Sequence, residues 1–136
     1  MKLSMFISLE KEFEEFRNKI EPFFQPETAS GEFNNSIPST GHCAVVAAII
    51  YSLYGGEMVS AIVDGVSHWF NRITIDQYIM DIDLTGDQFG EDKVQIMFSG
   101  DLYPNTKVRQ YSELNKETLR RIGLFAGRAG IEHENI

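Results

Sequence analysis

The chain has 136 residues, of which 43% are hydrophobic, and a formal net charge of −8 at pH 7. A chain of this length buries roughly two-thirds of its unfolded surface, so we expect a single domain over residues 1–136 that needs no disulfide or metal to fold. The negative charge argues against a nucleic-acid partner, because phosphate binding requires a basic surface. No run approaches the roughly 20 apolar residues of a membrane span, and the apolar stretch at the start is too short for a signal peptide. We therefore expect a cytoplasmic protein with no membrane association, where a single cysteine stays reduced.

The first expected element is an amphipathic helix near residues 6–20. Its apolar residues fall on one stripe at helical spacing: Leu9, Phe13, Phe16 and Ile20. We interpret the charged residues of this helix as a solvated face. A turn-rich segment, 28–38, follows two prolines and leads towards the only cysteine. It is either one wall of a cleft or a plain surface connector.

A second helix is expected near residues 43–54. It is apolar nearly all round, which is typical of a central core helix, and Gly55 and Gly56 end it. Cys43 stands at its first turn, directly after the tight run 39–42. The unpaired amides and peptide dipoles at a helix start favour a thiolate, so the position indicates a reactive nucleophile. A cysteine in the middle of the helix would instead indicate packing.

Strands are expected near residues 57–63, 66–73, 77–84 and 93–98, joined by short turns such as the hairpin signal Asp64-Gly65. Residues 105–129 have apolar side chains at near-helical spacing and are expected to form one or two helices. These elements predict an α+β fold. The helix carrying the cysteine should pack on a mainly antiparallel sheet of about four strands, with flanking N- and C-terminal helices.

The expected hairpin between the second and third strands brings a histidine and an aspartate together. A turn centred on residues 75–76 places His68 directly opposite Asp83, with Cβ atoms roughly 5 Å apart, and places Asp81 opposite Phe70. A three- or five-residue loop shifts the register and favours Asp81 or leaves both carboxylates diagonal. We therefore prefer Asp83 as the partner of His68, with Asp81 as the alternative.

Three residues then form a candidate catalytic triad. Cys43 would attack a carbonyl, His68 would hold or shuttle the proton, and Asp83 would orient the imidazole. The Cys43 amide is a candidate oxyanion donor. Side-chain donors upstream are not distinguished by their spacing: Asn34, Asn35 and His42. The competing interpretation is a helix start followed by an ordinary hairpin with one charge pair.

Residues beside the triad are candidates for substrate binding. They are His42, Trp69, Phe70 and Asn71. By strand alternation one of the two aromatic residues should face into the packing, and Phe70 shares the face of His68. Residues His42, Cys43, His68 and an aspartate lack the spacing of a zinc site, and no glycine-rich phosphate loop is present. We therefore expect no metal and no cofactor.

Several short motifs together resemble a known family. They are Thr40-Gly41-His42-Cys43-Ala44, Gly55-Gly56-Glu57, His68-Trp69-Phe70-Asn71, Asp83-Leu84-Thr85 with Gln88-Phe89, and the pair Arg109 and Tyr111. Over about residues 36–115 the chain resembles the YunG-like proteins, a family of small, largely uncharacterised bacterial proteins. More widely it resembles the papain-like and transglutaminase-like superfamily, which includes the arylamine acetyltransferases. Two departures are His42, where many YunG-like proteins are expected to have Gln, and a longer segment after Asn115.

The resemblance implies a papain-like or transglutaminase-like fold and a Cys-His-Asp triad in the order found here, and it supplies no substrate. The leading functional hypothesis is a thiol-dependent hydrolase or acyltransferase acting on the amide or thioester carbonyl of a peptide or small molecule. The alternative is a non-catalytic binding or interaction module that keeps the fold.

Overall fold

A computed structural model describes residues 3–132 of the chain. Its helices are α1 (Leu3–Ile20), α2 (Cys43–Tyr54) and α3 (Lys116–Ala129), and its strands are β1 (Glu57–Val63), β2 (Val66–Ile75), β3 (Tyr78–Asp83), β4 (Gln95–Phe98) and β5 (Lys107–Arg109). The fold is therefore α+β, as the sequence predicts. Within residues 3–132, no helix combines the length and apolar character that a membrane span requires.

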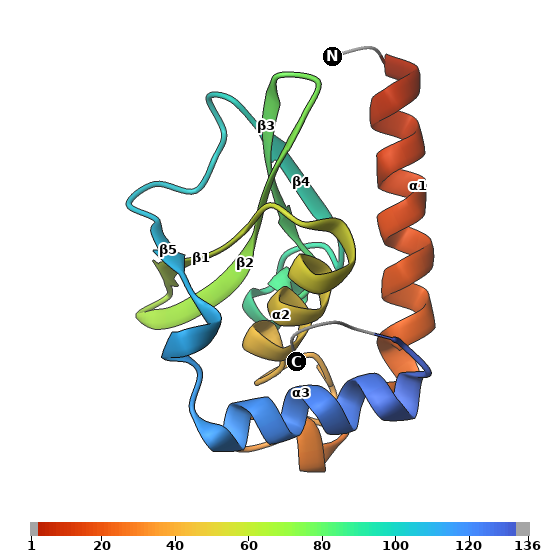
Figure 1. Ribbon diagram of the computed structural model, residues 1–136, viewed down its shortest axis with the longest axis vertical. Helices are drawn as coiled ribbons and strands as arrows, with labels where there is room; N and C mark the ends of the chain where they lie inside the picture. Colours follow the sequence, from red (N-terminus) through yellow and green to blue (C-terminus); the bar gives the residue numbers. More distant parts are fainter. Residues whose placement is uncertain (1–2, 133–136) are drawn as a thin grey trace.

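The strands form one antiparallel sheet in the order β4-β3-β2-β1-β5 (Figure 1). The prediction of about four strands is wrong by one, because β5 lies where a helix was expected. This strand is three residues long and pairs with β1 from Met58↔Arg109 to Ser60↔Lys107. A strand so short carries no detectable period of its own, and its Val108 coincides with the helical stripe of the residues that follow.

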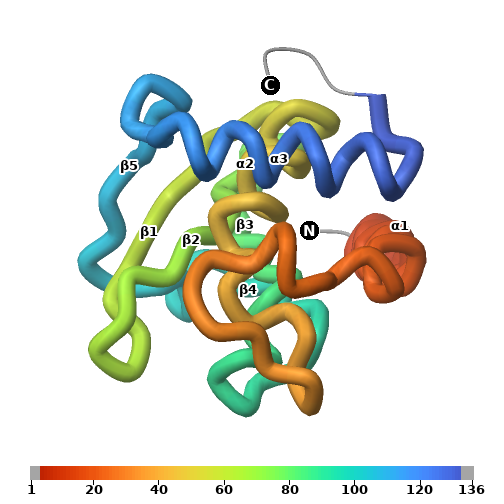
Figure 2. The backbone as a smooth tube through the Cα atoms, turned by 90° about the horizontal axis from the view of Figure 1, so that it is seen from below, coloured from red at the N-terminus to blue at the C-terminus, as the bar shows by residue number. Residues whose placement is uncertain are grey.

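Helix α2 lies between β2 of the sheet and α3 (Figure 2). Residues Val45 to Ile50 are all buried, which agrees with its almost wholly apolar sequence. Two side chains from other elements reach its backbone. Asn71 donates to the carbonyl of Ala47 at 2.8 Å, and Tyr111 donates to that of Ala48 at 2.8 Å. These contacts hold the helix on the sheet, so its first residue, Cys43, has a defined position.

Both hairpins close through two-residue turns with positive φ at both positions, the geometry that suits the strand twist. Asp64 and Gly65 have φ of 49° and 76°, which confirms the turn predicted there. In the β2–β3 hairpin the turn residues are Asp76 and Gln77, with Ile75 paired to Tyr78. This turn lies one residue later than predicted.

The later turn changes the register of β2 against β3. Arg72 pairs with Asp81, and Asn71 pairs with Ile82. Continuing this register places Asp83 beside Phe70, so His68 lies diagonal to Asp83 instead of directly opposite it. The direct opposition predicted from the sequence is therefore wrong. The register differs from the predicted one by two residues, which is an even shift, so residues expected to share a face of the sheet still share it.

Candidate functional site

Cys43 is the first residue of α2 and lies on the wall of a cleft of about 490 Å³. The cleft is formed by the loop and first turn around Cys43, the start of β2, the 3₁₀ turn η3 (Gly86–Phe89) and residues of α3. The first amides of an α-helix have no partner within it. His42, in the cap position, makes no side-chain hydrogen bond to them. A nucleophile and candidate backbone donors thus border the same space.

His68 is fully buried and hydrogen-bonds to Asp83, with Nε2 and Oδ2 separated by 2.8 Å. The same Asp83 oxygen accepts the hydroxyl of Tyr103 at 3.0 Å, and Oδ1 accepts the Thr85 amide at 3.1 Å. Burial and the neighbouring Asp83 raise the pKa of Tyr103, so its hydroxyl remains a donor. The buried carboxylate is therefore satisfied on both oxygens, and it keeps the His68 ring in one orientation.

The environment of His68 favours its charged form. Burial lowers the pKa of His68, but hydrogen bonding and charge from Asp83 and Cys43 outweigh it and raise the pKa to about 9. Since Nε2 is engaged by Asp83, the other ring nitrogen, Nδ1, is left for the thiol. Asp83 and Cys43 thus both act on the same His68 ring.

The 3₁₀ turn η3 contributes two residues beside His68 that sequence reasoning missed. The Nε2 atom of Gln88 lies 3.5 Å from Nδ1 of His68 and donates to the carbonyl of Thr85 at 3.0 Å. The Phe89 ring packs edge-on against the His68 ring, with centroids 4.8 Å apart. Both residues also line the cleft. Their only sequence signal is the dipeptide 88–89 within the YunG-like motif set, which carries no role by itself.

Of the four residues proposed for substrate binding, the structure places only Trp69 on the cleft wall. Phe70 points to the other side of β2, where it stacks on His68 and packs against Tyr103 in a second apolar cluster. Asn71 is buried and holds the backbone of α2. Neither residue lines the cleft, because alternation along β2 and the packing of α2 bury these side chains.

His42, which was expected to serve as an oxyanion donor or in substrate binding, is also absent from the cleft lining. Its ring is buried between Phe24 and Phe125, and Nε2 lies 2.8 Å from the hydroxyl of Thr28. Burial lowers the pKa of His42 to about 4, so the ring is neutral near pH 7. His42 is therefore a packing residue that anchors the loop before Cys43.

The other two candidate donors, Asn34 and Asn35, line a separate hollow in the preceding loop. The Asn34 side chain accepts hydrogen bonds from the amides of Ser36 and Ile37 and closes a local turn.

The alternative triad partner Asp81 is bound by Arg72 at 2.7 and 3.0 Å and by the amide of Tyr103 at 2.9 Å. It is thus committed to a structural ion pair. In the described part of the chain, no group of three or more His, Cys, Asp or Glu is placed to hold a metal ion.

A close backbone contact fixes the loop before Cys43. Gly41 has φ of 82°, and a Cβ atom there would lie 2.5 Å from the carbonyl oxygen of Ser30. Its own carbonyl accepts the Ser30 amide at 2.9 Å. Glycine adopts this φ without strain and, having no Cβ, leaves room for the backbone of Ser30. The run 39–42 is therefore tied to Ser30, which lines the same cleft.

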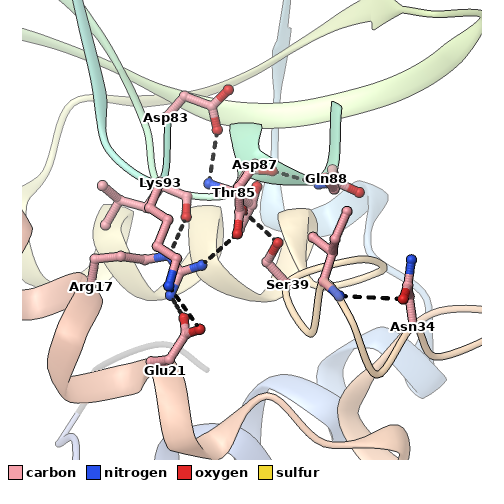
Figure 3. A network of polar contacts seen from close by, with 11 residues as sticks. Arg17, Glu21, Asn34, Ser39, Asp83, Thr85, Asp87, Gln88 and Lys93 are labelled. Carbon is pink, nitrogen blue, oxygen red and sulfur yellow. Dashed lines mark hydrogen bonds and ion pairs between the residues drawn. The ribbon is translucent and has the colours of Figure 1, made fainter. Parts of the chain in front are cut away.

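A buried arginine joins this loop to η3 (Figure 3). Arg17 of α1 donates to the carbonyl of Leu84 at 2.7 Å and to Asp87 at 3.0 Å, and it pairs with Glu21. The second oxygen of Asp87 accepts the hydroxyl of Ser39 at 2.6 Å. Arg17 is 1% exposed, so interpreting all the charges of this helix as a solvated face is wrong. The network positions both segments that border Cys43.

The family model for the YunG protein matches residues 12–123. No curated protein and no solved structure matches the chain. The matched residues include Cys43, His68 and Asp83 and cover more than half of the chain, and on this ground the chain belongs to the YunG protein family.

Proposed function

We propose that this protein is a thiol-dependent hydrolase or acyltransferase that acts on an amide or thioester carbonyl through Cys43, His68 and Asp83. The observation that supports the proposal is that Cys43, at the start of α2, and Asp83 both act on the His68 ring. A cysteine on a cleft wall and a buried aspartate together raise the pKa of His68 to about 9. An imidazolium beside a helix start favours the thiolate, which is the nucleophilic form of cysteine.

The proposed reaction has two steps, acylation of Cys43 and deacylation. The Cys43 thiolate adds to the carbonyl carbon, and the resulting oxyanion is stabilised by first-turn amides of α2 and by the Gln88 N–H that is not bonded to the Thr85 carbonyl. The intermediate collapses, the bond to the leaving amine or thiol breaks, and His68 gives that group its proton. Water or an acceptor amine then attacks the acyl-enzyme carbonyl, and His68 takes up the proton of the attacking group. The bond between the acyl carbon and Cys43 Sγ breaks, which releases the acid or amide product and regenerates the thiolate. Asp83 keeps the imidazole oriented throughout.

The order Cys, His, Asp and a cysteine-bearing helix on an antiparallel sheet support a papain-like or transglutaminase-like architecture. A single reduced thiol also suits the cytoplasm. The substrate class on this proposal is a peptide or a small acyl compound. Neither nucleic acid nor a membrane is part of it.

Alkylation by iodoacetamide tests the proposal, because Cys43 is the only cysteine and every thioether adduct on a cysteine therefore reports on it. We expect a rate that stays high between pH 6 and 7, well below the value near 8.5 at which a free thiol is half ionised, and a profile that moves upward in His68→Ala. Profiling with an electrophilic acyl-type probe in cell extract then identifies the acyl group accepted. A thiol that reacts no faster than cysteine in a peptide, with no change in His68→Ala, would favour the binding-module alternative.

A further inference from the structure

Among the residues that line the Cys43 cleft, Arg121 is the one with a permanently charged side chain. Apart from the Cys43 thiol, the rest of the lining consists of apolar, hydroxyl-bearing or amide-bearing residues. Arg121 lies on α3, so it reaches the cleft from an element other than those that carry the triad. A single cation in such a cleft selects for the charge of whatever binds there.

The guanidinium of Arg121 is incompletely paired. Its side chain is 13% exposed, and its Nε atom is buried with no hydrogen-bond partner. One terminal nitrogen donates to the hydroxyl of Thr118 at 2.9 Å, and the other lies 3.6 Å from Glu117. Glu117 is more than half exposed and makes shorter contacts, of 2.6 and 3.1 Å, to Arg120. Arg121 therefore lacks a dedicated carboxylate.

A largely buried cation without a close counter-ion is costly, and a bound anion relieves that cost. Guanidinium binds carboxylate through paired, charge-assisted hydrogen bonds. Thr118 also lines the cleft, and because its oxygen already accepts from Arg121, its O–H remains free to donate. One cation in a chain of net charge −8 matches a monoanion better than a phosphate dianion.

We propose that Arg121, with Thr118, binds a carboxylate of the substrate while Cys43 attacks its acyl group. The inference deepens the proposed function and rests on it. The wall of the same cleft also carries Val45, Val66, Trp69 and Phe89. These side chains fit an apolar stem, so the substrate class is an acyl compound with an apolar segment that ends in a carboxylate.

Paired alkylating probes test the subsite. One arm uses N-iodoacetyl-6-aminohexanoic acid and its primary amide, and a second uses an N-iodoacetyl dipeptide as free acid and as amide, which separates a small carboxylate from a peptide C-terminus. In at least one arm we expect the acid to alkylate Cys43 at least about 10-fold faster than its amide at limiting probe concentration, since a charge-assisted pair contributes on that order. Arg121→Gln should bring the ratio near one, and Arg121→Lys should restore part of it.

Arg128→Gln is the matched control, because it removes one positive charge from the same helix outside the cleft. It should leave the ratio unchanged. A ratio near one in wild type, or an equal loss in both variants, would overturn the carboxylate subsite. Rapid alkylation by the amide probes would still support the proposed function. The carboxylate subsite and the proposed function can therefore be rejected independently.

A binding measurement tests the subsite even if the Cys43 thiol is unreactive or the Arg121→Gln variant does not fold. In Cys43→Ser protein, hexanoate should shift the Arg121 Nε–H resonance in a saturable way, and hexanamide should not. Equal shifts, or none with either compound, would contradict the subsite without reference to thiol chemistry.

Discussion

Asp83 accepts the Nε2–H of His68 at 2.8 Å across a diagonal of the β2–β3 hairpin. The residue opposite Asp83 on β2, when the register is continued, is Phe70. The Phe70 ring stacks on His68 with centroids 6.0 Å apart. The contact is completed by Tyr103, which donates to the same oxygen from the segment between β4 and β5. His68 and Asp83 thus come from one hairpin, and tertiary structure adds Tyr103 as a third member of the hydrogen-bonded group.

The two neighbouring aspartates are expected to respond differently to amide substitution. Asp83→Asn removes a charge that raises the pKa of His68, so alkylation of Cys43 near pH 6.5 should slow, and hydrolysis should fall by less than in Cys43→Ala. Asp81→Asn breaks the ion pair with Arg72 and should lower stability while leaving the alkylation profile in place. Alkylation rates and urea unfolding of both variants measure this. Slower alkylation in Asp81→Asn alone would reverse the assignment.

His68 is expected to make stability fall on the alkaline side. Its pKa is raised from 6.5 to about 9, so the folded protein holds a proton that the unfolded chain loses. The stabilisation is complete below pH 6.5 and is lost as pH rises through 9, with a full span of about 3 kcal/mol. In His68→Gln the fall in unfolding free energy between pH 6.5 and 9 should be smaller. An identical alkaline slope in both proteins would show that His68 is not charged in the fold.

His42 should have the opposite effect on the acid side. Its pKa is lowered from 6.5 to about 4, so only the unfolded chain takes up a proton between these values. Its contribution is therefore present above pH 6.5 and is lost as pH falls through 4. Chemical unfolding of His42→Gln should show a shallower decline over that interval. Each histidine variant is the control for the other, because each should flatten one limb only.

Gly41→Ala should be far more damaging than Gly31→Ala. Both glycines have positive φ, of 82° and 77°, so both substitutions carry the backbone strain. Only at Gly41 does the added Cβ meet a backbone carbonyl, at 2.5 Å, whereas nothing lies within 4 Å at Gly31. The Gly41 variant should lose stability and Cys43 reactivity, and the Gly31 variant should lose about 1 kcal/mol of stability. Thermal unfolding and iodoacetamide kinetics distinguish these outcomes, and equal effects would contradict the close contact.

Arg17→Met should destabilise the protein by about 3 kcal/mol or more, because it leaves the partly buried Asp87 beside Ser39 without its cation. Lys19→Met removes the same charge from an exposed position of the same helix and should change stability by less than about 0.5 kcal/mol. Alkylation of Cys43 should also change in Arg17→Met, since the network positions η3 and the loop before α2. A variant as stable as Lys19→Met would mean that the network contributes little.

Gln88→Ala separates two kinds of reaction at Cys43. Acyl transfer forms an oxyanion, and removing one donor costs about 100-fold or more in rate. Alkylation by iodoacetamide displaces iodide at a saturated carbon and forms no oxyanion. The variant should therefore alkylate at nearly the wild-type rate and hydrolyse the substrate found by profiling much more slowly. Parallel losses in both reactions would indicate that Gln88 positions His68 instead.

The sequence by itself determined the elements whose pattern is local. Helix α2 begins and ends at the predicted residues because its apolar run is bounded by a tight turn and two glycines. The first hairpin follows from Asp64 and Gly65, whose backbone preferences select the turn. The alternation of faces along β2 and β3 required His68 and Asp83 to share a side, whichever even shift the turn adopted.

Tertiary structure decided what depends on residues distant in sequence. The burial of Arg17 and His42, the third partner Tyr103, the placement of Gln88 beside His68 and the pairing of β5 with β1 all arise from packing between separate elements. Nothing in the local pattern marks these positions, because a charged residue on an amphipathic helix looks the same whether water or a buried carboxylate faces it. The cleft also depends on tertiary structure, because its walls come from five separate segments of the chain and only the fold brings Arg121 to the space that Cys43 borders.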